Sequence, residues 1–264
     1  MERALRPIGR LACPGPAPPT RSPLRQVRRR GLATIPAMGT LYLVRHGQAS
    51  FGSDNYDQLS PLGVRQCQRL GEYFASKGRR FDAVMTGTLV RQTQSLDAIT
   101  AGLGANLSGQ LPTALRLPGL NEYDSHAVIA AVHPEPLARP DTPELYKHHF
   151  GLLRKGLACW MAGSTQPVGM PRYADFVAGI RDALDRVRGS GHAEVLMVSS
   201  GGPISTAVGQ VLGTAPEVTI ELNMRIRNSA VTEFVFNPKR HMLLSYNALP
   251  HLDAEGYAEW VTYA

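Results

Sequence analysis

The sequence has few cysteines and no long hydrophobic run. Its 264 residues include three cysteines, which are widely separated and odd in number: Cys13, Cys67 and Cys159. They fit neither a disulfide framework nor a zinc pattern, which favours a reducing compartment. No apolar run approaches the roughly 18 residues that suggest a membrane span. We therefore expect a globular cytoplasmic protein with no membrane partner.

The sequence also lacks an excess of either charge outside its N-terminal end. The formal net charge is +7. Residues 1–37 hold eight arginines and one acid, which leaves 20 basic and 20 acidic side chains in the remainder. The body of the protein therefore has no basic excess that would indicate nucleic acid binding.

Residues 1–37 form an Arg/Pro-rich tail that we expect to be disordered. They contain seven of the 20 prolines and show no apolar period, so they cannot bury enough surface to offset their ordering entropy. Three explanations stay open: a transit peptide, which the prolines disfavour, a nucleic-acid arm at residues 28–30, and translation that starts at Met38 in the cell. We favour the third explanation and assign residues 38–264 to one domain.

Strands and helices alternate from residue 40 onward. Ser60 and Pro61 indicate the start of a helix, and Gly78 indicates its end. The apolar stripe expected on this helix comprises Val64, Cys67, Leu70 and Phe74. Further helices are expected at about 89–101 and 173–187, and strands at 40–44, 81–85, 114–117, 195–199, 230–236 and 242–246. This pattern predicts an α/β fold, a three-layer sandwich with a mostly parallel central sheet and helices on both faces.

Two arginines and a histidine follow the first two strands. Arg45-His46-Gly47 places a potential nucleophile beside a cation at a strand end, where ligands bind in open α/β sheets. A glycine there would let the backbone come close to a bound anion. Arg91 lies in the first turn of the next helix, where it opposes the helix dipole. An anion shared with the helix N-terminus would explain this position.

A carboxylate and a glycine pair follow the next two strands. Glu122 lies in Leu-Asn-Glu after the third strand. Ser200-Gly201-Gly202 follows the fourth strand, where small residues free backbone N–H groups for phosphate oxygens. Each signal is weak alone, whereas the four together are much more specific.

These four motifs together resemble the histidine phosphatase superfamily, also called the phosphoglycerate mutase-like family. The resemblance covers about residues 40–248. The segment at 56–63 is similar to the family's sequence before its first helix, and the segment at 227–232 is similar to its penultimate strand.

The resemblance implies a phosphomonoester hydrolase of the Arg-His-Gly type, with mutase activity less expected. His46 would attack the phosphoryl group and carry it as a phosphohistidine, and Glu122 would serve as general acid and base. Arg45 and Arg91 would hold the phosphoryl oxygens of a small anionic substrate, so no metal or other cofactor is expected. The residues expected to contact substrate are Gly47, Asn55 and Gly201.

One residue departs from the family pattern. The family usually has a second histidine directly before the glycine pair, where this sequence has Ser200. Losing one preorganised donor typically costs about 10²- to 10³-fold in rate. His126 and His133 could compensate. Two functions stay open: a slow phosphatase, and a pseudoenzyme that serves as a phosphate-ligand-binding or protein-interaction module.

The span between Glu122 and the fourth strand is far longer than a simple crossover needs. We predict that residues 123–170 form an inserted helical cap over the carboxyl end of the sheet, with a helix in the stretch 144–161. Basic residues in this stretch could favour anionic substrates. Neither the substrate nor the oligomeric state follows from these patterns.

Overall fold

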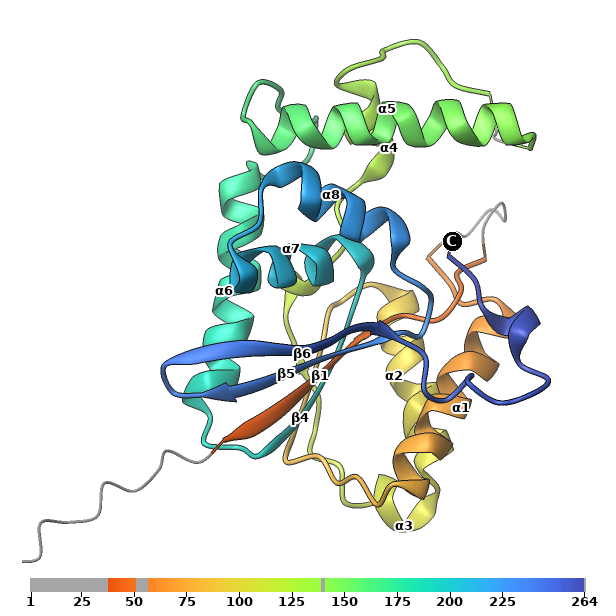
Figure 1. Ribbon diagram of the computed structural model, residues 1–264, viewed down its shortest axis with the longest axis vertical. Coiled ribbons are helices and arrows are strands. Elements are labelled where there is room, and N and C mark those ends of the chain that lie inside the picture. The colour runs from red at the N-terminus through yellow and green to blue at the C-terminus, as the bar shows by residue number, and fades with distance from the viewer. Residues whose placement is uncertain (1–37, 51–56, 139–140, 264) are drawn as a thin grey trace, which may run out of the picture. The chain divides into compact units, whose positions relative to one another are not determined.

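The computed structural model describes residues 38–50, 57–138 and 141–263, which Figure 1 shows as a ribbon. The predicted tail and Asn55 lie outside the described residues. The strands are β1 (Gly39–Arg45), β2 (Ala83–Thr86), β3 (Leu115–Arg116), β4 (Glu194–Ser199), β5 (Val231–Asn237) and β6 (Arg240–Ala248). The helices are α1 (Pro61–Ser76), α2 (Val90–Leu103), α3 (Ala105–Ser108), α4 (Ser125–Ala130), α5 (Pro143–Met161), α6 (Tyr173–Gly189), α7 (Gly201–Leu212) and α8 (Pro216–Arg225), with short 3-10 turns η1 (Pro118–Leu120) and η2 (Ala258–Trp260).

The described strands form one sheet in the order β3-β2-β4-β1-β5-β6. β1, β2, β3 and β4 run parallel, whereas β5 runs antiparallel to β1 and β6 antiparallel to β5. The expected mostly parallel sheet is confirmed, although β3 has only two residues instead of the predicted four. Because β1, β2 and β4 are parallel, the loops that follow them lie at the same edge of the sheet.

Helices cover both faces of the sheet, which confirms the layered α/β fold. Successive residues of a strand point to opposite faces. Leu41 and Leu43 of β1 therefore pack against α6 and α7, whereas Tyr42 and Val44 pack against α1 and α2. Figure 1 shows α1 and α2 on one side of the strands and α6 and α7 on the other.

α1 has the predicted termini but a shifted apolar stripe. At the N-terminus, the Ser60 hydroxyl accepts a hydrogen bond from the backbone N–H of Gly63 (3.0 Å). After the C-terminus, Gly78 has a φ of +63°, a conformation that glycine adopts readily. Cys67, Leu70 and Phe74 are buried as expected. The inclusion of Val64 is wrong, since it is 42% exposed. The first turn directs Gly63 inward instead, where it lies against the backbone of Gln48.

The long span after Glu122 contains α4 and α5, and the helix expected at 144–161 is present as α5. Residues of α4, α5 and α8 share an apolar cluster that includes Val128, Trp160 and Ile220. Figure 1 shows α5 beyond α8, away from the sheet. Its role as a substrate cover stays a prediction. None of the helices in the described part of the chain is long and apolar enough to cross a membrane.

Candidate active site

The backbone of His46 is fixed where three strands meet. Arg45 ends β1 opposite Ser199, the last residue of the parallel strand β4. The N–H of His46 donates to the carbonyl of Ser199 (2.9 Å), and the carbonyl of His46 accepts from the N–H of Ser229 (3.1 Å). His46 is only 3% exposed. The residue predicted as a nucleophile is therefore held at the carboxyl edge of the sheet.

The hydrogen bonds of the His46 ring define its proton positions. Nδ1 lies 2.7 Å from the carbonyl oxygen of Gly47. That oxygen can only accept, so Nδ1 carries the proton and Nε2 keeps a lone pair. Nε2 accepts from Nε of Arg91 at 3.3 Å. Burial lowers the pKa of His46 well below its usual 6.5, and the positive charges of Arg45 and Arg91 lower this pKa further. The ring is therefore neutral, with Nε2 directed at Arg91.

The two arginines approach the ring from different segments and are held by different partners. Nη1 of Arg45 donates to the carbonyl oxygens of Ile226 (2.6 Å) and Tyr263 (2.7 Å). Arg91, the second residue of α2, is 8% exposed and forms an ion pair with Asp57 (2.8 Å). The fold thus places both predicted arginines beside His46.

Asp57 supplies an anion at the N-terminus of α2. Its Oδ2 accepts from the N–H of Val90 (2.9 Å), and its Oδ1 accepts from Nη1 of Arg91 and, at 3.4 Å, from its N–H. The sequence predicts an anion shared by Arg91 and the helix N-terminus, and here a carboxylate of the protein fills that position. The position of Arg91 in the helix therefore does not by itself require a phosphate.

Glu122 lies at the start of the loop after η1 and faces the N-terminus of α7. Its Oε1 accepts from the N–H of Gly202 (3.0 Å) and the N–H of Tyr123 (3.3 Å). Burial raises the pKa of this carboxyl above its usual 4.5, although these hydrogen bonds and the charges of Arg91 and Arg45 oppose the rise. A side chain at position 202 would displace this carboxyl, since a Cβ there would lie 2.2 Å from Oε1. The glycine permits the close approach of carboxyl and helix.

Ser200 is completely buried and is held from the side by α2. Its Oγ accepts from Nε2 of Gln92 (2.8 Å), and the same nitrogen donates to the carbonyl of Leu120 (2.8 Å). Gln92 thereby joins the segment before Glu122 to the segment before α7. Because Ser200 accepts this bond through its oxygen, its hydroxyl proton can still donate a hydrogen bond.

The glycines of the site have packing functions in the structure. A Cβ on Gly47 would lie 2.4 Å from the carbonyl oxygen of Gly63, and one on Gly201 would lie 2.8 Å from Oδ1 of Asn223. The structure thus requires a glycine at position 47 for contact with α1, whereas close approach to an anion was the reason expected from the sequence. Substrate contacts by Gly47 and Gly201 stay predictions.

The two histidines considered as substitutes for the missing one lie in or after α4. His126 is exposed. Nδ1 of His133 lies 3.1 Å from the carboxylate of Glu135, and its ring lies 6.0 Å from that of His148. These contacts direct His133 toward the segments around α5, and compensation for Ser200 by either histidine stays a prediction.

A polar network that was not predicted from the sequence joins the C-terminal segment to the site. Gln66 of α1 is completely buried, accepts from the N–H of Gln48 (2.8 Å) and donates to Oγ1 of Thr262 (3.0 Å). Thr262 donates in turn to Oδ1 of Asn228 (3.0 Å). Asn228 belongs to the segment that resembles the family's penultimate strand, but residues near the C-terminus show no motif. Asp57 lies in the family-like segment 56–63 and Gln92 directly follows Arg91, but the sequence alone assigned no function to either residue.

The assembled site combines a neutral imidazole, two guanidinium groups and a carboxyl group with a raised pKa. Such a set can bind an anion, attack it with a nitrogen and supply a proton to a departing oxygen. Within residues 38–50, 57–138 and 141–263, no group of three or more His, Cys, Asp or Glu side chains is arranged to hold a metal ion.

Comparison with protein families gives a match over most of the chain. Residues 41–249 match the histidine phosphatase superfamily (branch 1). No curated protein matches this chain.

Solved structures with the same fold include two phosphatases and a mutase. A phosphoserine phosphatase from Entamoeba histolytica in complex with 3-phosphoglyceric acid is 19% identical, with a TM-score of 0.55 over 81% of this chain and 99% of that one. A mycobacterial glucosyl-3-phosphoglycerate phosphatase is 18% identical, with a TM-score of 0.56 over 80% and 99%. A phosphoglycerate mutase from Bacillus anthracis is 16% identical, with a TM-score of 0.55 over 82% and 96%. At these identities the likeness shows the fold.

Proposed function

Because the chain belongs to the histidine phosphatase superfamily (branch 1), we propose that it hydrolyses phosphomonoesters through a phosphohistidine at His46, without a metal ion. The observation that carries the proposal is the state of the His46 ring. It is buried, it is protonated at Nδ1, and it directs Nε2 at Arg91. A neutral nitrogen beside a guanidinium group is suited to attack on an anionic phosphoryl group, because the cation offsets charge in the transition state.

The first step transfers the phosphoryl group to the protein. Nε2 of His46 forms the new P–N bond as the ester P–O bond breaks. Arg91 turns its donors from Nε2 to the phosphoryl oxygens, and Arg45 holds a second edge of the group. Glu122 gives its proton to the departing oxygen, which leaves as an alcohol. The raised pKa of Glu122 supports this role, since it favours the protonated form at the start of the step.

The second step releases phosphate. The Glu122 carboxylate takes a proton from water while the water oxygen attacks phosphorus and the P–N bond breaks. This step restores the neutral imidazole and the protonated carboxyl and gives inorganic phosphate. The substrate is a small anionic phosphorylated molecule in a cytoplasmic setting, and a mutase is the less favoured reaction.

A second function, phosphate binding without turnover, is favoured by one observation. Ser200 carries no charge, and its Oγ already accepts from Gln92 (2.8 Å). A chain that had lost the usual second histidine would keep Arg45 and Arg91 for an anion while transferring the phosphoryl group too slowly to act as an enzyme.

Hydrolysis of 4-nitrophenyl phosphate by the full chain separates the two functions. We expect His46→Ala to lower the rate by at least about 10³-fold relative to wild type, since the attacking group is removed. The matched control is His192→Ala, at an exposed histidine before β4, at the opposite end of the sheet. Activity of the wild type should persist in EDTA.

Equal and negligible rates in wild type and His46→Ala would overturn the phosphatase proposal. Binding of inorganic phosphate to the same inactive chain, lost in Arg91→Ala, would then establish the binding function.

A further inference from the structure

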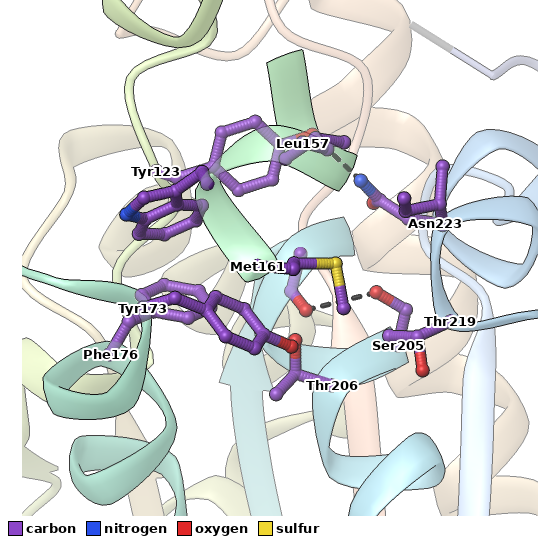
Figure 2. Close-up of a pocket in the computed structure, with 12 residues that line it drawn as sticks. Tyr123, Leu157, Met161, Tyr173, Phe176, Ser205, Thr206, Thr219 and Asn223 are labelled. Atoms are coloured by element: carbon purple, nitrogen blue, oxygen red, sulfur yellow. Dashed lines mark hydrogen bonds between the residues drawn. The ribbon is translucent and has the colours of Figure 1, made fainter. Parts of the chain in front are cut away.

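Tyr123 follows Glu122 in the sequence, and its side chain packs among the helices around the site. Its hydroxyl accepts a hydrogen bond from Nδ2 of Asn223 in α8 (2.7 Å), which Figure 2 shows as a dashed line. The centre of its ring lies 6.1 Å from that of Trp160 in α5 and 6.5 Å from that of Phe176 in α6. Tyr123 therefore connects the residue proposed as proton donor to three helices.

The same ring also lies against the first turn of α7. A Cβ at position 202 would lie 2.6 Å from Cδ1 of Tyr123 and 2.2 Å from Oε1 of Glu122. The glycine at this position therefore lets the ring and the carboxyl approach the helix at one point. The carboxyl accepts there from the N–H of Gly202 (3.0 Å) and from the N–H of Tyr123 (3.3 Å). The ring of Tyr123 and the carboxyl of Glu122 are thus packed on the same residue.

These contacts determine the direction of the carboxyl only while two separate segments stay together. The N–H of Gly202 belongs to α7, whereas the N–H of Tyr123 belongs to the loop after η1. The packing of the Tyr123 ring on Gly202 and its bond to Asn223 hold that loop against α7 and α8. Without the ring, the loop would lose these contacts and the carboxyl would lose its fixed direction.

We propose that Tyr123 is a positioning residue that holds the Glu122 carboxyl against α7, where it can protonate the departing oxygen of the substrate. The inference rests on the proposed function, since it assumes the acid role of Glu122. The groups expected to bind the phosphoryl oxygens are held by other partners, Arg45 by two backbone carbonyls and Arg91 by Asp57. Loss of the Tyr123 ring should therefore impair proton transfer and leave phosphate binding unchanged.

Two esters with different leaving groups separate positioning from packing. Butyl phosphate needs a proton on its leaving alcohol, whereas 4-nitrophenolate leaves without one. In the full chain, Tyr123→Leu should lower kcat/KM about 10²-fold for butyl phosphate and less than about tenfold for 4-nitrophenyl phosphate, since misplacing a catalytic group has such a cost. Tyr123→Phe keeps the ring and loses only the bond to Asn223, so it should restore most of the rate with butyl phosphate. Calorimetry should show unchanged binding of inorganic phosphate in both variants.

Tyr173→Leu is the matched control. The ring centre of Tyr173 lies 5.1 Å from that of Trp160, in the same aromatic cluster. The N–H groups bonded to Glu122 belong instead to Tyr123 and Gly202. Tyr173→Leu should lower the midpoint of thermal unfolding as Tyr123→Leu does, and kcat/KM for the two esters should change by the same factor. A Tyr123→Leu protein that loses the same factor with both esters would overturn the inference.

A nuclear magnetic resonance measurement tests the positioning without turnover. The amide proton of Gly202 is bonded to Glu122, so its signal should shift with pH as the carboxyl titrates, and Glu122→Gln should abolish this shift. The shift should be smaller in Tyr123→Leu and unchanged in Tyr173→Leu. If these shifts are observed but neither ester is hydrolysed, the proposed hydrolysis fails and the positioning stands. If the esters are hydrolysed but the shift is equal in Tyr123→Leu and wild type, the positioning fails and the hydrolysis stands.

Discussion

Burial has opposite consequences for the two titratable residues of the proposed mechanism. It disfavours the charged form of each group, so it lowers the pKa of His46 and raises the pKa of Glu122. The nucleophile is thereby kept neutral, and the protonated form of the acid is favoured. This is the combination that the first step needs.

The pH dependence of catalysis follows from these two directions. Glu122 must be protonated to act, so kcat/KM for an alkyl phosphate ester, whose leaving group needs a proton, should fall as the pH rises through the pKa of Glu122, which lies above 4.5. His46 must be neutral, and its pKa lies well below 6.5, so it causes no loss near neutral pH. Glu122→Gln should lower kcat/KM by about 10²- to 10⁴-fold and remove the decline that Glu122 causes. Steady-state rates across the pH range measure both effects.

Two comparisons make this result specific. 4-Nitrophenolate leaves without a proton, so 4-nitrophenyl phosphate should lose less than about tenfold in kcat/KM with Glu122→Gln. Any pH dependence that remains in the variant reports ionisation of the substrate. An unchanged decline at high pH in Glu122→Gln would assign the acid role to another group.

At the scale of single elements, Gly202 at the N-terminus of α7 lets the carboxyl of Glu122 approach the helix because it has no side chain. A Cβ at position 202 would lie 2.2 Å from Oε1 of Glu122. We expect Gly202→Ala to displace the carboxyl and lower kcat/KM for alkyl esters about 10²-fold, since a small misplacement of a catalytic group has that cost. Gly201→Ala is the matched comparison. Its Cβ meets Oδ1 of Asn223 at 2.8 Å and lies 3.7 Å from Glu122, so the loss should be smaller. Equal losses would contradict the argument.

The C-terminal segment around η2 positions Arg45, although the two are far apart in the sequence. The carbonyl of Tyr263 accepts from Nη1 of Arg45, 218 residues away in the sequence. The neighbouring Thr262 is bonded to both Gln66 and Asn228 through its hydroxyl. Thr262→Val removes these bonds at nearly constant volume. We expect the KM for phosphate esters to rise about tenfold as Arg45 loses its fixed position, and the free energy of unfolding to fall by about 1–2 kcal/mol.

Thr262→Ser separates positioning from stability. The serine keeps the hydroxyl and loses a methyl group, so KM should return to the wild-type value even if the midpoint of thermal unfolding does not. A Thr262→Val protein with lowered stability and unchanged KM would show that the segment has a structural role only.

The elements that the sequence predicted well are those with a period or a terminal signal. Ser60 and Pro61 begin α1, and the stripe of α6 is present, because capping and helical spacing are local properties. Val64 was misplaced because the local pattern does not show that Gly63 must approach Gln48. The C-terminal segment was missed because it contacts the site through the backbone carbonyl of Tyr263 and the hydroxyl of Thr262, groups too common to form a sequence motif.

At the scale of the whole molecule, the parallel sheet brings Arg45, Arg91, Glu122 and Gly201 together, and this much followed from the order of motifs and strands. The contacts that residues next to them make, such as those of Gln92 and Asp57, could not be predicted from that order. Gln92 reaches Ser200 only because α2 packs on the face that α7 does not occupy. Asp57 fills a position where sequence reasoning expected a bound anion. Side-chain partners of this kind depend on which helix faces meet, and that is decided by tertiary packing.

Buried histidines make the folded state as a whole sensitive to acid. His251 is 1% exposed, and burial lowers its pKa from 6.5 to about 3. In the unfolded chain it gains a proton as the pH falls below about 6.5. The folded state gains this proton only as the pH approaches about 3. The free energy of unfolding that neutral His251 contributes above pH 6.5 is therefore lost as the pH falls from about 6.5 to about 3. His251→Gln should reduce the slope of unfolding free energy between about pH 5.5 and 4 by roughly 1.4 kcal/mol per pH unit. Urea denaturation measures this slope, and exposed His192→Gln is the control. A slope as steep in His251→Gln as in wild type would mean that His251 is protonated in the folded protein.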